Sequence, residues 1–420
     1  MTASVLTGAE GFLARYAGLR DRLPGNPAAR HAAAEAFRHA GLPGRRVEAW
    51  KYTDLRLIAS AAFHEPISRR ADCAGLLARI PRLDAPRLIF VDGMFCADLS
   101  DIPGTVRFTR FADHPDFGTL ARPDNEPIVA LNTMLAEDGA IIDVAEGEDA
   151  GLLHLVSLAA NSPTPTDIHP RHTIRLAHGA KLTLLETSIG EGGYLHSPVT
   201  EIHVADAAAL THIRLQNESP TAFHLSTLYV EIADRGTYDS FMLNLGARMA
   251  RAEIHADLVG PGATAHLNGV QLLSGTQHAD ITTIVRHDAP HGTSRQTVKN
   301  VLAGRSRGVF QGRIEVARHA QKTDGYQMNQ ALLLSPDAEI DTKPELEIFA
   351  DDVKCSHGAT IGELDADQMF YLRSRGIPDA EARSILVRAF LAESLDTIAN
   401  GAVRGALEHA VEDWWERQGA

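Results

Sequence analysis

Cysteine and histidine stand two residues apart in a short polar segment near the end of the chain, residues 350–360 (ADDVKCSHGAT). If this segment is a strand, Cys355 and His357 share one face, because alternate side chains of a strand point to the same side. A thiolate and an imidazole are then presented together, and both are suited to iron. Lys354 is expected to favour the thiolate form of Cys355. The alternative, a buried structural cysteine beside a surface histidine, stays open.

The cysteine count limits the metal chemistry that the chain can do alone. Its three cysteines, Cys73, Cys96 and Cys355, lie far apart and form no Cys-x-x-Cys pair. Neither a disulfide framework nor a closed zinc site is therefore indicated. Because an iron-sulfur cluster usually needs about four ligands, mostly thiolates, any cluster that this chain touches is expected to take ligands from another subunit.

The chain has 20 histidines, and several lie in segments of alternating polarity where they could share a sheet face, namely His172, His203, His212, His255 and His266. A metal site needs converging ligands that further hydrogen bonds hold in place. No His-x-His or His-Glu-x-x-His spacing occurs. We therefore interpret these residues as hydrogen-bonded core or surface histidines.

Two signatures of enzyme chemistry are missing or misplaced. No Gly-Lys dipeptide occurs, so the chain lacks a phosphate-binding Gly-x-x-x-x-Gly-Lys loop and any ATP-driven step must come from elsewhere. Residues 304–308 (GRSRG) match Gly-x-Ser-x-Gly, but a strand-like segment follows where a nucleophile elbow requires a helix. The sequence thus predicts a turn there and no catalytic centre in this chain.

The composition of the chain limits the class of protein to which it can belong. With 420 residues, 44% of them hydrophobic and 22% charged, the chain should fold into two or three units with a substantial core. A net charge of -14 opposes binding to nucleic acid, which relies on Lys and Arg. No apolar run approaches the roughly 20 residues of a membrane span, and residues 1–16 lack a signal-peptide pattern. We expect a cytoplasmic protein.

Between about residues 152 and 348 the pattern consists of short alternating segments, including 172–176, 181–185, 200–204 and 211–215. Such segments predict half-buried strands. Small turn residues punctuate them, at 179–180, 206–207, 235–236, 261–262, 278–279, 307–308, 319–320 and 337–338. Since no long helices intervene, a doubly wound α/β fold is excluded. The stacked coils of a β-helix are favoured over a large sandwich or jelly roll, although periodicity alone cannot separate them.

Both ends of the chain predict helices. Thr7 and Glu10 have capping-box spacing for a first helix, and Asn26, Pro27 and Gly41 bound a second. Residues 87–95 predict a strand, 127–138 a helix, and 367–375, 379 onward and 402–417 three C-terminal helices. Trp414 and Trp415 are expected to pack on the chain's own core, or else on another protein.

Four segments resemble the SufB/SufD family of iron-sulfur assembly proteins, namely residues 326–335 (YQMNQALLLS), 343–348 (KPELEI), 351–362 and 370–377 (FYLRSRGI). Residues 45–55 (RRVEAWKYTDL) and 130–139 (ALNTMLAEDG) are similar to the SufD branch in particular. The resemblance covers most of the chain. SufB proteins usually carry Glu-His-Glu-Ala where this chain has Cys355-Ser356-His357-Gly358, so the SufD branch is the better match.

The resemblance implies a fold and partners. It implies a right-handed β-helix flanked by helical ends, with an N-terminal unit at 1–115, a β-helix core at 116–362 and a C-terminal helical unit at 363–420. Such a chain pairs with a SufB-type subunit through the β-helices. It also binds the ABC-type ATPase SufC through its C-terminal helices, where Phe370, Tyr371, Arg375 and Phe390 are the expected contacts.

The resemblance also implies a site. His357 matches the family histidine that holds a transient iron-sulfur cluster together with a SufB cysteine, and Cys355 matches a family cysteine that is either a second ligand or a packing residue. Asp351 and Asp352 match a family motif at the subunit interface. Alternatively, these two aspartates cap the turn before the strand. No permanently bound cofactor is expected. A flavin is possible for the complex, but no Gly-x-Gly-x-x-Gly turn in this sequence supports a site for it.

Three alternatives stay open at this stage. The chain could be a SufB-like carrier that holds a cluster by itself, which the cysteine count opposes. It could be a carbohydrate-active enzyme built on a β-helix, an idea that rests on analogy of fold alone. The isolated chain could also form a homodimer, because a solenoid with open sheet ends needs capping.

Overall fold

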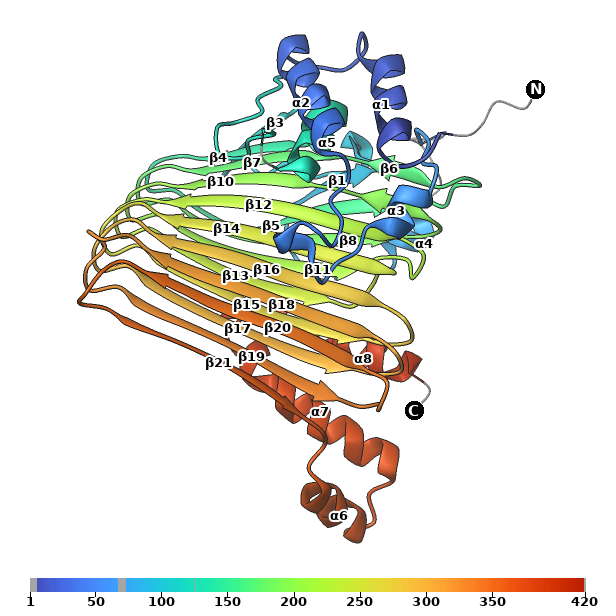
Figure 1. Ribbon diagram of the computed structural model, residues 1–420, viewed down its shortest axis with the longest axis vertical. Coiled ribbons are helices and arrows are strands. Elements are labelled where there is room, and N and C mark those ends of the chain that lie inside the picture. Colours follow the sequence, from blue (N-terminus) through green and yellow to red (C-terminus); the bar gives the residue numbers. More distant parts are fainter. Residues whose placement is uncertain (1–5, 67–72, 125, 419–420) are drawn as a thin grey trace.

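The computed structural model describes residues 6–66, 73–124 and 126–418. Two large sheets face each other, with helices at the N-terminal end and a further helical unit formed by the C-terminal residues (Figure 1). The mainly β fold that the sequence predicts, a β-solenoid flanked by helical units, is confirmed. The division into three units at 115 and 362 stays a prediction.

Among the described residues the first sheet has 10 strands, in the order β2-β1-β5-β8-β11-β13-β15-β17-β19-β21. Their bounds are β1 (Arg87–Val91), β2 (Met94–Phe95), β5 (Asp149–Ala159), β8 (Lys181–Gly190), β11 (Ala209–Asn217), β13 (Thr237–Asn244), β15 (Thr264–Leu273), β17 (Thr293–Leu302), β19 (Asp324–Leu333) and β21 (Lys354–Gly362). From β5 onward the chain leaves this sheet after each strand and returns one coil later.

The second sheet has 11 strands within the same described ranges, and its main path runs β20-β18-β16-β14-β12-β10-β7-β4-β3 while β6 and β9 lie beside it. Their bounds are β3 (Arg107–Arg110), β4 (Ala140–Val144), β6 (Thr166–Ile168), β7 (Arg171–Leu176), β9 (Tyr194–His196), β10 (Val199–Val204), β12 (Phe223–Ile232), β14 (Met249–Leu258), β16 (His278–His287), β18 (Arg307–Val316) and β20 (Glu339–Ile348).

Successive coils stack residue on residue. Leu267, Gln296 and Gln327 are register partners on β15, β17 and β19, at steps of 29 and 31 residues. The inward positions of both sheets form a continuous apolar core that includes Leu184, Ile202 and Val230. The fixed register means that a residue's neighbours are found one coil earlier and one coil later rather than beside it in the sequence.

Buried amide side chains run along the inside of the first sheet. Gln271 Nε2 donates to Asn300 Oδ1 at 2.7 Å, and Asn300 Nδ2 donates to Asn329 Oδ1 at 2.8 Å. Asn329 lies in the segment 326–335 that resembles the family. Because a buried amide is costly without partners, these bonds tie each coil to the next.

The N-terminal end of the solenoid is covered. Helices α1 (Gly8–Leu19), α2 (Pro27–Ala40) and α5 (Pro127–Leu135) bury Phe12, Phe37 and Leu131 in one cluster. The Arg30 guanidinium, which is fully buried, donates to the carbonyl oxygens of Thr133 and Ala136 at the end of α5. Shorter helices follow at η1 (Glu48–Trp50), α3 (Arg56–Ser60), α4 (Ala74–Leu77) and η2 (Ala97–Leu99).

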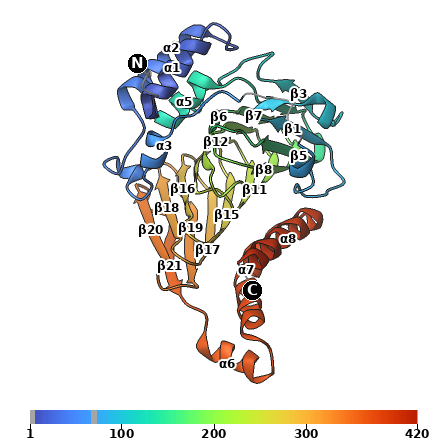
Figure 2. The same cartoon turned by 90° about the vertical axis from the view of Figure 1, so that its right-hand side faces the viewer.

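The C-terminal helices lie beside the solenoid. Helix α6 (Ala366–Ser374) projects away from it, and α7 (Asp379–Leu395) with α8 (Gly401–Arg417) returns along the first sheet (Figure 2). Leu391 and Leu407 pack with Val301 on the outer face of that sheet. Trp414 is only 2% exposed, so it packs on the chain's own core as expected, with Trp415 partly buried beside it.

Three local predictions are wrong. Thr7 makes no capping hydrogen bond to α1. The expected turns at 278–279 and 307–308 lie inside β16 and β18, while the left-handed turn residues are Gly275 and Gly304. Ala279 and Gly308 are register partners that face inward. A Cβ on Gly308 would lie 3.0 Å from Ile340 Cδ1. These residues are small because the core is crowded there.

Candidate functional site

Strand β21 is the last strand of the first sheet, and among the described residues it pairs only with β19. His357 lies in register with Gln327 and Cys355 with Gly325. The Gln327 side chain crosses the solenoid and donates to the Gly312 carbonyl at 2.9 Å, so this face of β19 points inward. His357 and Cys355 point the same way. Because no coil lies beyond them, the His357 side chain is exposed at the open end.

Cys355 is half-buried at the same end. Its side chain packs beside Ile314, Val316 and Ala350, and burial raises the pKa of the Cys355 thiol. The prediction that Lys354 favours the thiolate form of Cys355 is wrong, because consecutive side chains of a strand point to opposite faces. Burial thus disfavours the thiolate, which is the form of Cys355 that would bind a metal, and a ligand role stays a prediction for both Cys355 and His357.

The two aspartates precede β21 in a bend. Asp352 forms an ion pair with Lys322, its backbone N–H donates to Gln321 Oε1 at 2.9 Å, and its carbonyl accepts from Lys322 N–H at 2.7 Å. These bonds stabilise the turn that leads into the last strand. Asp351 is exposed beside it, and a role in iron capture stays a prediction for both residues.

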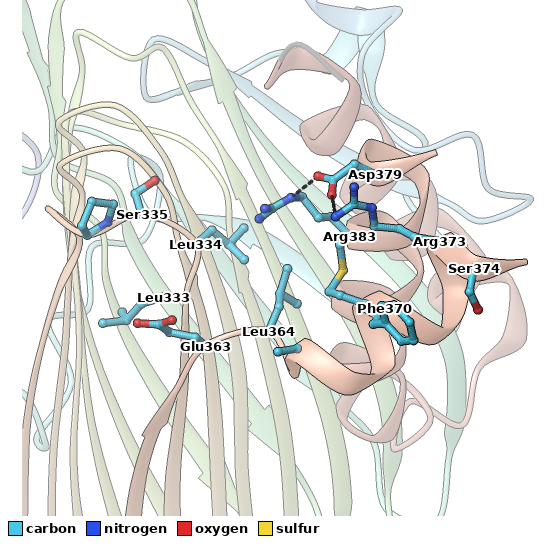
Figure 3. Close-up of a pocket in the computed structure, with 13 residues that line it drawn as sticks. Leu333, Leu334, Ser335, Glu363, Leu364, Phe370, Arg373, Ser374, Asp379 and Arg383 are labelled. Atoms are coloured by element: carbon cyan, nitrogen blue, oxygen red, sulfur yellow. Dashed lines mark hydrogen bonds and ion pairs between the residues drawn. The ribbon is translucent and has the colours of Figure 1, made fainter. Parts of the chain in front are cut away.

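Helix α6 displays aromatic side chains. Phe370 is 74% and Tyr371 57% exposed, and the Arg375 guanidinium lies 5.2 Å from the Tyr371 ring centre. A groove of about 900 Å³ runs between α6, the start of α7 and the segment after β19, and Phe370 and Leu334 line it (Figure 3). The fourth predicted contact, Phe390, is separate from this surface, because it is half-buried on α7 over Lys299.

Comparison with known proteins identifies the family. Residues 158–390 match the model described as "SUF system FeS cluster assembly, SufBD core domain", and residues 24–150 match the "SufBD protein N-terminal region". The chain belongs to the SufBD family. It is 34% identical to the iron-sulfur cluster assembly protein SufD of Escherichia coli, over 87% of each chain. A SufBD family protein of Synechocystis is 32% identical over 91% of this chain and 89% of its own.

A third relative, the chloroplastic protein ABCI7 of Arabidopsis thaliana, is 30% identical over 94% of this chain and 88% of its own length. The family that the sequence motifs predict is therefore confirmed, and with it a role in iron-sulfur cluster assembly by the SUF system. Among the described residues, no helix combines the length and the apolar character that a bilayer crossing requires.

The five histidines that lie in the alternating segments of the sequence all contact other groups in the structure. His212 Nε2 lies 3.1 Å from Glu186 Oε2, His172 Nδ1 accepts from Ala140 N–H at 3.0 Å, and His255 Nε2 lies 3.0 Å from Glu253 Oε1. His203 and His266 lie 3.9 Å from a carboxylate oxygen. His172, His212 and His255 are hydrogen-bonded, as the sequence interpretation predicts. The contacts of His203 and His266 are too long for hydrogen bonds.

Sequence reasoning missed a different group of histidines. His196 and His224 converge on Glu218, and all three side chains are buried. His196 and His224 are register partners on β9 and β12. Their separation of 28 residues is the sequence signal, because it is close to the length of one coil. A search for metal-ligating residues at short spacing could not find it.

Proposed function

We propose that this chain is a non-catalytic scaffold subunit that pairs through the open end of its solenoid and offers His357 to a nascent iron-sulfur cluster. The supporting observation is the placement of an exposed imidazole on the inward face of an edge strand. A second solenoid that stacked on β20 and β21 would bring its own side chains over His357. A cluster could then be held between the two subunits, which fits the shortage of cysteines in this one.

A SufB-type subunit is the proposed partner at this end. It would supply most thiolate ligands, since one imidazole and one half-buried thiol cannot hold a cluster alone. Cys355 would contribute only when its thiol is deprotonated, because the thiolate is the form that binds metal. Asp351 and Asp352 would lie at the rim of the same interface. No permanently bound cofactor or flavin forms part of this proposal.

A SufC-type ABC ATPase is the proposed partner of the C-terminal helices. Two large aromatic side chains on α6 are more exposed than a helix without a partner needs, and one of them, Phe370, lines the groove of Figure 3. Phe370, Tyr371 and Arg375 are the proposed contacts on α6, and Phe390 on α7 is proposed as a separate contact. The ATPase would supply the nucleotide chemistry for which this chain has no Gly-Lys loop.

We place this complex in the cytoplasm. None of the three cysteines forms a disulfide in the described part of the chain, which suits a reducing compartment.

The test is cluster assembly by the reconstituted complex of this chain with its SufB-type and SufC-type partners. His357→Ala is expected to lower the rate of cluster transfer to an apoprotein about tenfold or more, while complex formation persists. His319→Ala is the matched control, because His319 is exposed on a loop where it contacts Asp288. Normal cluster transfer by the His357→Ala complex would remove His357 from the mechanism.

A further inference from the structure

Glu218 is a buried carboxylate whose ion pairs, within the described ranges, are with imidazoles alone. Its side chain is 1% exposed, and its oxygens lie 3.0 Å from His196 Nδ1 and 2.7 Å from His224 Nδ1. Several other buried carboxylates pair with guanidinium groups: Glu201 with Arg171, Asp280 with Arg251, and Asp138 with Arg110. Since burying an unbalanced charge is costly, Glu218 needs a positive charge, and within the described ranges no guanidinium or ammonium group pairs with it.

The fold brings these three residues together from two walls of the solenoid. His196 and His224 stand side by side on β9 and β12 in the second sheet. The same inward register position holds small or apolar residues in the neighbouring coils, namely Ile168, Ala250, Ala279 and Gly308. Glu218 follows β11 of the opposite sheet. Two adjacent histidines therefore interrupt an apolar row where a carboxylate faces them.

One buried polar atom beside Glu218, His196 Nε2, has no hydrogen-bond partner within the described residues. An unsatisfied buried polar atom costs about 1–3 kcal/mol, and such an atom is uncommon in a native structure. The Gln216 amide donates to Glu218 Oε2 at 2.8 Å. Such a hydrogen bond orients a carboxylate in the way that metal-binding carboxylates are oriented.

We propose that His196, Glu218 and His224 bind one divalent transition-metal ion of the Zn²⁺ or Fe²⁺ type. One ligand atom from each residue lies within 4.8 Å of the others, and ligand atoms about 2.1 Å from one ion are about 3.0–3.4 Å apart. Two imidazoles and one carboxylate suit these ions, whereas Mg²⁺ and Ca²⁺ prefer oxygen ligands alone. The site lies inside the solenoid, does not involve His357 and stands independently of the function proposed above.

Glu218 also lies between two spaces. It lines a hollow of about 550 Å³ at the edge of the solenoid and, with His196, a small internal pocket. The hollow is the route by which an ion would reach Glu218 in this proposal. Arg79, Arg248 and Arg417 line the same hollow, so their charges should make loading of a cation slow. The metal content of the freshly purified chain is therefore as informative as a later titration of the chain with metal.

The experiment measures metal in the full chain, purified anaerobically without a polyhistidine tag. Elemental analysis is expected to find about one equivalent of zinc or iron per chain, which falls below about 0.1 equivalent in Glu218→Gln. Prolonged incubation of chelator-treated chain with Co²⁺, Zn²⁺ or Fe²⁺ should restore one equivalent in the wild-type chain only. His196→Asn and His224→Asn should behave like Glu218→Gln.

His212→Asn is the matched control, because His212 is equally buried and also contacts a glutamate, Glu186. This variant should keep the full metal content. X-ray absorption of the loaded wild-type chain needs no variant and should show two imidazole ligands without sulfur. A wild-type chain that takes up no metal, a Glu218→Gln chain that keeps it, or a sulfur-dominated coordination shell would each overturn the proposal. A metal-free chain would mean that the pairing of Glu218 with the two imidazoles is structural.

Discussion

The two ends of the solenoid are built differently. At the N-terminal end each sheet finishes in a short antiparallel strand, β2 with 2 residues and β3 with 4, and α1, α2 and α5 lie over that end (Figure 1). At the other end each sheet finishes in a long parallel strand, β20 with 10 residues and β21 with 9. Within the described residues nothing pairs with their outer edges.

This difference indicates a different role for each end of the solenoid. A long edge strand offers a row of unpaired backbone groups to any other strand, and proteins normally shorten, cover or charge such edges. The N-terminal end follows that rule. The C-terminal end keeps its edges and exposes Ile348, Phe349 and Ile361 beside them. We therefore expect the N-terminal end to contribute to the stability of the fold and the C-terminal end to pair with a partner subunit. Each prediction below tests that division.

The largest effect is expected for a phenylalanine of the covered end. Phe37 is fully buried and Phe349 is 65% exposed, so the same substitution separates the two roles. Phe37→Ala should lower the free energy of unfolding by about 3–5 kcal/mol because it leaves a cavity. Phe349→Ala should change it by less than about 0.5 kcal/mol and instead weaken binding to a SufB-type subunit. Urea unfolding and a binding titration measure the two effects, and equal losses of stability would contradict the division.

Proline in the edge strand should separate pairing from folding. The Lys354 N–H donates to the Thr323 carbonyl. Since alternate residues of a parallel strand bond to the same neighbour, the Thr360 N–H faces β19 and the Ala359 N–H faces the open edge. Thr360→Pro should therefore cost about 2 kcal/mol of stability through a lost hydrogen bond.

Ala359→Pro should leave the free energy of unfolding nearly unchanged but abolish pairing with a SufB-type subunit, because proline is tolerated at a free edge and blocks strand addition. Thermal unfolding and size-exclusion chromatography of the mixed subunits measure both variants. Normal pairing by Ala359→Pro would show that the partner does not extend this sheet.

A smaller effect on stability is expected from pH, and it arises from a histidine buried inside the solenoid. Burial lowers the pKa of His287 to about 4, below its ordinary value of about 6.5. The unfolded chain then binds more protons than the folded chain between these values, so stability falls as pH drops from about 6.5 to 4, by at most about 1.4 kcal/mol per pH unit for this residue. Below pH 4 both states are protonated and the loss is complete.

His287→Gln should reduce the slope of unfolding free energy against pH by up to one proton in this window. His319→Gln, at an exposed histidine, is the matched control. Urea unfolding at several pH values provides the measurement, and an equal change of slope in both variants would show that burial of His287 is not the cause.

Much of the fold could be predicted because alternation marks strands wherever one face is buried. Turns at Gly179, Ala207, Arg235 and Gly262 were predictable from residue type, and all four have left-handed backbone. The turns at Gly275 and Gly304 were misplaced, since Ala279 and Gly308 are small for a packing reason that depends on the neighbouring coil. Residue type alone cannot distinguish a residue that must be small from one that must turn.

The candidate sites divide in the same way. His357 and Cys355 could be found because they are close in sequence and lie within a family motif. Their environments could not, because the depth of Cys355 depends on Ile314 of β18 and on Ala350, which follows β20. The group around Glu218 could not be found either. It forms only when the register places His196 beside His224, and that register is a property of the stacked coils.

The most direct test of the account is hydrogen exchange of this chain alone and bound to a SufB-type subunit. The account predicts that amides of residues 340–348 and 354–362 gain protection on binding, while those of residues 8–40 do not change. Protection confined to the N-terminal helices, with no change in β20 and β21, would contradict the claim that the open end is the pairing surface.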